Sequence, residues 1–137
     1  MQTATHIPVR LPPFGKFTEK LNEAGVVTGT GRQFWGGVND KGEIIVTAWI
    51  DQMRSDGRFP IWRPKTNHGG LLDQWRIGNI RNGADVRLIL LRQRGNLPEG
   101  VGTRQVGMAA LMPGKWRVVE VLAGDGPHAF IEASPNT

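Results

Sequence analysis

Residues 62–70 combine, in nine consecutive positions, an indole ring, two cations, an amide, an imidazole and two glycines. The glycines allow a backbone to approach a ligand closely, and the other groups can stack on a planar molecule or hydrogen-bond to its edge. A second amide, indole and guanidinium follow at residues 74–76. We therefore expect a pocket for a planar polar group, built from Trp62, Arg63, Lys65, Asn67, His68, Gln74, Trp75 and Arg76. The alternative is a long surface turn in which Asn67 and His68 cap their own backbone.

Positive charge is concentrated in the same part of the chain. Residues 54–94 hold nine basic residues and three acids, whereas the whole chain has a net charge of +5. This pattern favours nucleic acid, DNA or RNA, because planar cations hold phosphates while bases stack on flat rings. On this hypothesis Trp62 and Trp75 stack on a base, Asn67, His68 and Gln74 contact its edge, and the phosphates meet Arg63, Lys65, Arg76, Arg92 and Arg94. The alternative is that these charges serve only solubility.

The other tryptophans, Trp35, Trp49 and Trp116, are expected in the core more than at a ligand. Buried tryptophan is common in small β-domains, and Trp116 alternates with Val118 as a core residue does.

Catalysis has little support in the sequence. The histidines at 6, 68 and 128 lack the spacing of a metal site, and the absence of cysteine excludes a thiolate ligand or thiol nucleophile. We expect no metal and no cofactor. A second hypothesis is a small nuclease or nucleotide hydrolase in which His68, with Asp73 or Glu43, is the base. A third is an interaction or inhibitory protein whose arginine face meets an acidic protein partner.

The sequence predicts a cytoplasmic protein without a membrane partner. Chains without cysteine fit a reducing compartment. No apolar run approaches the roughly 20 residues that span a bilayer, and the first residues lack the apolar segment of a secretion signal.

The composition predicts one mainly β domain with one short N-terminal helix, an α+β chain. The 137 residues include 19 glycines and 9 prolines, which are typical of short strands joined by tight turns. Phe14, Phe17 and Leu21 share a helical face that Gly25 can end. Strands are expected at 34–38, 43–50, 59–63, 86–91, 105–111, 115–122 and 129–133. An irregular arm (1–12) precedes the domain (13–133), and a tail (134–137) follows it.

Two strands carry more specific predictions. Pro60 places its strand at an edge, because proline donates no ladder hydrogen bond, and the apolar strand at 86–91 is expected to be central. A long charged loop is expected at 92–103. Six or seven short strands favour a small closed or partly closed mixed β-barrel, with a β-sandwich as the alternative.

Residues 34–121, about two-thirds of the chain, resemble the PUA-like group of small β-barrels, which includes the EVE and ASCH families. The similar features are the aromatic pair Phe34-Trp35, the polar aromatic loop at 62–75, a glycine turn entering an apolar strand at 83–88, and a late strand pair. Ala84 and the run at 92–95 depart from that pattern. The resemblance implies a concave pocket that binds RNA or a DNA base, sometimes a modified base turned out of its duplex, with residues 62–75 around the base.

Overall fold

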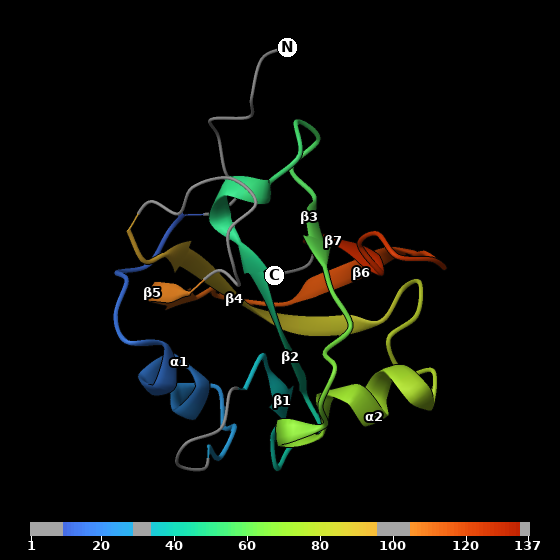
Figure 1. The fold of residues 1–137 in the computed structure, drawn as a ribbon, viewed down its shortest axis with the longest axis horizontal. Helices are drawn as coiled ribbons and strands as arrows, with labels where there is room; N and C mark the ends of the chain where they lie inside the picture. Colours follow the sequence, from blue (N-terminus) through green and yellow to red (C-terminus); the bar gives the residue numbers. More distant parts are fainter. Residues whose placement is uncertain (1–9, 29–33, 96–104, 135–137) are drawn as a thin grey trace.

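The computed structural model of the protein describes residues 10–28, 34–95 and 105–134 (Figure 1). This part of the chain is mainly β, with seven strands in one mixed sheet and two short helices. The elements are α1 (Phe17–Glu23), β1 (Gly37–Val38), β2 (Ile44–Trp49), β3 (Phe59–Ile61), α2 (Leu71–Arg76), β4 (Asp85–Gln93), β5 (Val106–Leu111), β6 (Trp116–Val121) and β7 (Ala129–Ala133), with 3-10 turns η1 (Ile50–Gln52) and η2 (His68–Gly70). The mainly β prediction is confirmed.

The helix α1 forms where the sequence predicts it. Leu21 is buried, and Phe17 packs against the same apolar cluster. Gly25 follows the helix with φ +92°, a left-handed conformation that glycine adopts without strain. The amide of Val26 then donates to the Leu21 carbonyl at 2.9 Å and closes the helix end.

The strands follow the order β1-β2-β4-β6-β7-β3, and β5 pairs with β4 off this path. β2 and β4 are parallel, and the other pairs are antiparallel. β4 is therefore central, and β3, which contains Pro60, lies at an end of the path. Both predictions are confirmed.

Apolar side chains cover both faces of the β2–β4 pair. The larger cluster holds Val46 of β2, Leu88 of β4 and the fully buried Trp116 of β6. The smaller cluster holds Ile45 and Ile89 together with Leu21 of α1. This alternation, with period two along each strand, buries side chains on both faces of β2, and the predicted core position of Trp116 is confirmed.

The sheet remains open. The ladder path ends at β1 and β3, and within the described ranges no ladder joins β2 to β3, although these two strands approach each other. The prediction of a closed barrel is thus not confirmed. Because β4 pairs with both β2 and β6, the strands belong to one sheet rather than to the two sheets of a sandwich.

The helix α2 is not among the predicted elements, because the glycines at 69 and 70 favour a turn at this place. Leu71 and Leu72 are buried, so burial against the core stabilises a helix of only six residues. The Asn67 side-chain oxygen accepts the Asp73 amide at 2.9 Å and satisfies one donor of the first turn. None of the helices in the described residues could cross a membrane, since all are too short and too polar.

Asn39 joins the end of α1 to the turn between β1 and β2. Its buried amide nitrogen donates to the Ala24 carbonyl at 2.9 Å and to Glu43 Oε1 at 2.8 Å. Its oxygen accepts the amides of Lys41 at 3.0 Å and Glu43 at 2.9 Å. The hydrogen bond from Asn39, followed by the charges of Arg87, Lys41 and Lys115, lowers the pKa of Glu43 although burial opposes this.

We predict that Glu43→Gln removes a pH-dependent part of stability. The pKa of Glu43 is lower in the folded chain, so its ionised form stabilises the fold above the unfolded pKa, and this is lost as the pH falls through the folded pKa. We expect a loss of about 0.5–1 kcal/mol near pH 7 that disappears in acid, where Glu43 is protonated in both states, measured by urea unfolding at both pH values. Asp125→Asn, the same charge change at an exposed position, is the control. A loss that is equal at both pH values would contradict the prediction.

Candidate functional site

A cavity of about 540 Å³ lies between the end of β2 and the segment that follows β3. Three indoles, two cations and several uncharged polar groups surround it. The lining residues are Trp35, Thr47, Trp49, Gln52, Trp62, Arg63, Pro64, Lys65, Thr66 and His68.

The open sheet explains why a hollow exists at this place. β3 pairs with β7 over Phe59–Ile61, and after Ile61 the chain leaves the ladder and continues toward α2 (Figure 1). Residues 62–66 therefore run near β2 without pairing with it. Side chains from the two segments line the gap that is left between them.

Two indoles form the wall on the β2 side. The rings of Trp35 and Trp49 have centroids 6.2 Å apart and are tilted by 57°. Thr47 Oγ1 donates to the Trp35 carbonyl at 2.9 Å, which holds residue 35 beside β2. Phe17 of α1 supports Trp35 from behind, with centroids 6.4 Å apart. Both indoles pack against the smaller core cluster and also line the cavity, so the core assignment made from sequence describes only part of their surroundings.

The opposite wall is polar and cationic. Trp62 is 45% exposed and stands beside the exposed Arg63 and Lys65. The His68 ring lies 5.4 Å from the Phe34 ring, and His68 Nδ1 is 3.3 Å from Thr66 Oγ1. None of the described lining residues is an acid, so the cavity suits an aromatic ligand that carries negative charge.

Gln52 contributes a polar group without a partner. Its Oε1 is buried and accepts no hydrogen bond from any described residue. Such an oxygen costs about 1–3 kcal/mol when left unpaired. The same residue lines the cavity, so its amide is a candidate polar contact for a ligand there.

Four of the ten predicted site residues line the cavity, namely Trp62, Arg63, Lys65 and His68. Asn67 is instead engaged with α2, where its amide nitrogen donates to Asp73 Oδ2 at 2.9 Å. Gln74 Oε1 accepts from Asn79 at 2.7 Å. These two amides thus organise α2 and its C-terminal turn.

The remaining four predicted residues lie away from the lining. Trp75 packs against the larger core cluster, and Arg76 lies 3.8 Å from Asp73. The Arg92 guanidinium lies 4.1 Å above the centre of the Phe14 ring. Arg94 follows β4, and its amide donates to the Gln105 carbonyl at 2.8 Å.

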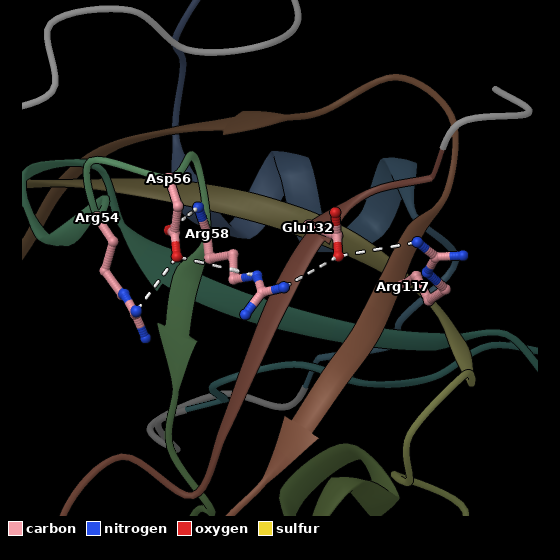
Figure 2. A network of polar contacts seen from close by, with 5 residues as sticks. All are labelled: Arg54, Asp56, Arg58, Arg117 and Glu132. Atoms are coloured by element: carbon pink, nitrogen blue, oxygen red, sulfur yellow. Dashed lines mark hydrogen bonds and ion pairs between the residues drawn. The ribbon is translucent and has the colours of Figure 1, made fainter.

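Other arginines of the basic stretch 54–94 form ion pairs beside β3, β7 and β6 (Figure 2). Asp56 pairs with Arg54 at 3.2 Å and with Arg58 at 4.0 Å. Glu132 pairs with Arg58 at 3.7 Å and with Arg117 at 3.8 Å. The basic stretch therefore serves more than one surface, and only Arg63 and Lys65 bring its charge to the cavity.

Asp73 and Glu43, the two acids considered as partners of a catalytic His68, are each hydrogen-bonded to an asparagine. Asp73 is bonded to Asn67, and Glu43 is bonded to Asn39 beside a separate cleft that Arg87 also lines. Across the described residues, no three or more metal-binding side chains cluster.

Close contacts between glycines fix the indole wall of the cavity relative to the wall that contains His68. A Cβ added to Gly69 would lie 2.6 Å from the Gly36 carbonyl oxygen, and one added to Gly37 would lie 2.9 Å from the Gly69 oxygen. The backbones before β1 and in η2 thus touch directly. This crossing, formed by Gly36, Gly37 and Gly69, places Trp35 and His68 around the same hollow.

No protein-family model, curated protein or solved structure matches the chain. The chemistry of the cavity is therefore the basis for a function.

We predict that Gly69→Ala destabilises the protein far more than Gly78→Ala. Both glycines are left-handed, with φ of +78° and +79°, but Gly78 has no atom within 4 Å of an added Cβ. The left-handed backbone costs each alanine about 1–2 kcal/mol. Overpacking at the crossing adds roughly 1–3 kcal/mol for Gly69 alone. Urea unfolding of both variants measures the difference, and equal losses would show that the crossing is not tight.

Proposed function

We propose that the protein is a nucleic-acid-binding module that holds one base in the cavity and the neighbouring phosphates at its rim. The observation that carries the proposal is the lining itself, in which three indoles and two cations surround about 540 Å³ and no described acid takes part. Stacking surface and positive charge at one opening are what a single-stranded or extruded nucleotide requires.

The indoles supply the affinity for the base. Trp35 and Trp49 are half-buried, Phe17 packs on the Trp35 ring, and the two indoles pack on each other, so little side-chain entropy is lost when a base stacks on them. Trp62 closes the opposite side. Thr47, Gln52 and His68 supply polar groups for the base edge, in place of Asn67 and Gln74.

The cations supply the affinity for the phosphates of the nucleic acid. Arg63 and Lys65 are exposed and flank the indole of Trp62. A guanidinium binds phosphate with two parallel hydrogen bonds, whereas an ammonium acts as a point charge. Arg76, Arg92 and Arg94 remain candidates for contacts with a longer strand.

We also propose that the open sheet is a partly closed barrel of the PUA-like kind. The approach of β2 to β3, which nearly completes a ring of strands around the larger core cluster, supports this reading. The position of the cavity beside that gap agrees with the concave pocket that the resemblance implies.

Deletion of one cavity indole tests the stacking. Trp62→Ala is expected to weaken binding of a labelled oligonucleotide by about 1–3 kcal/mol, because a stacking surface is lost. Fluorescence anisotropy with DNA and RNA oligonucleotides measures the change. Val121→Ala is the control, because Val121 is 44% exposed against 45% for Trp62 but lies outside the cavity. Unchanged affinity in folded Trp62→Ala protein would remove the proposed site.

Neutralisation of the rim cations tests the phosphate contacts. Arg63→Gln and Lys65→Gln should each reduce the slope of log affinity against log salt concentration by about one, because one phosphate contact is lost. Arg81→Gln makes the same charge change at an exposed position outside the cavity and should keep the slope. Equal slopes in all three variants would rule out phosphates at this rim. Tight binding of an acidic protein, without retention of any oligonucleotide, would favour the interaction-protein alternative.

A further inference from the structure

His128 lies directly behind the Trp62–Arg63 wall and is not among the lining residues. Its Nδ1 accepts the backbone amide of Arg63 at 3.0 Å. Its ring meets the Trp62 ring edge-on, with centroids 6.1 Å apart and planes at 83°. It meets Trp75 similarly, at 6.0 Å and 72°. One imidazole thus contacts the backbone and the indole of this wall at once.

The backbone of His128 is fixed on both sides. Its amide donates to the Ile61 carbonyl at 3.0 Å, and its carbonyl accepts the Leu122 amide at 2.8 Å. The ring is therefore an acceptor in a fixed place rather than a mobile surface group. Because an amide N–H points at Nδ1, that nitrogen carries the lone pair, and the neutral ring holds its proton on Nε2.

A second proton on His128 would break this arrangement. Protonated Nδ1 would face the Arg63 N–H with a donor instead of an acceptor, and the amide would lose its partner. No carboxylate in the described chain forms an ion pair with His128. The charged groups on the elements around it are Arg63 and Lys65 on the wall, Asp73 and Arg76 on α2, and Asp125 before β7. Asp73 pairs with Arg76 at 3.8 Å, so its charge is already matched by a cation on the same helix.

We infer that His128 is a positioning residue whose neutral form holds Trp62 and Arg63 in the geometry that binds ligand. The inference rests on the proposed function of the cavity. A doubly protonated ring has no acceptor for the Arg63 amide, so binding at this cavity weakens at low pH.

Two substitutions distinguish the role of His128 as a hydrogen-bond acceptor from the role of its ring in packing. His128→Phe keeps a flat ring against the two indoles but has no acceptor for the Arg63 amide. His128→Asn supplies an amide oxygen as acceptor and does not titrate. Any effect of pH on the lining residues themselves is common to all three proteins and cancels in the comparison.

The affinity for one labelled oligonucleotide is measured at about pH 7.5 and about pH 5.5. We expect native protein to lose about threefold to tenfold more affinity over this interval than His128→Asn loses. His128→Phe should already be weakened at the higher pH and show no extra loss at the lower pH. Equal pH dependence in native and His128→Asn protein would overturn the inference.

A ligand-free measurement separates this inference from the proposed function. In ¹⁵N NMR of the native protein, His128 should show the Nε2–H tautomer, and the Arg63 amide signal should shift as the ring becomes protonated. An Nδ1–H tautomer, or an Arg63 amide that does not respond, would refute the positioning contact. If no oligonucleotide binds at either pH while the Arg63 amide responds, the proposed function and its coupling to His128 both fail, although the contact stands.

Discussion

The close approach of two backbones at Gly36, Gly37 and Gly69 is the constraint on which the cavity depends. A side chain at this crossing would push the η2 turn away from β1, because the carbonyl oxygens already lie within 3 Å of where a Cβ would be. The segment before β1 carries Trp35, and η2 carries His68. The three glycines of the crossing are not among the lining residues of the cavity. Because they have no side chains, they still allow the indole wall and the polar wall to come together.

The strands and their faces could be read from local sequence, because each signal depends on a few neighbouring residues. Alternation along β2, proline in β3, and glycine after α1 fix conformation within one element. The helix α2 was missed because the glycines before it indicate a loop, whereas burial of Leu71 and Leu72 decides the outcome. That burial depends on β2 and β4, which no local pattern places next to α2.

Only part of the candidate site could be predicted, because local sequence does not show which distant segments lie next to one another. Residues 62–68 form a cluster of binding groups in the sequence, and all of them except Asn67 line the cavity. Trp35 and Trp49 could not be assigned to it, since an indole packs equally well in a core. Nothing in the sequence around Gln52 connects it with residues 62–68. Only the path of the chain after β3 leaves these side chains partly uncovered. Asn67 looked like a ligand contact, but its hydrogen bonds to Asp73 stabilise the first turn of α2.

The antiparallel pairing of β3 with β7 has a consequence for synthesis of the protein. β3 finds its only described ladder partner in Ala129–Ala133, some seventy positions further along the chain. A nascent chain that has emerged from the ribosome only as far as β6 has no strand to anchor residues 62–66. The wall formed by residues 62–66 would thus arise only when the last strand is released and docks, and a translation product that stops short of β7 would lack it however well its earlier strands had folded.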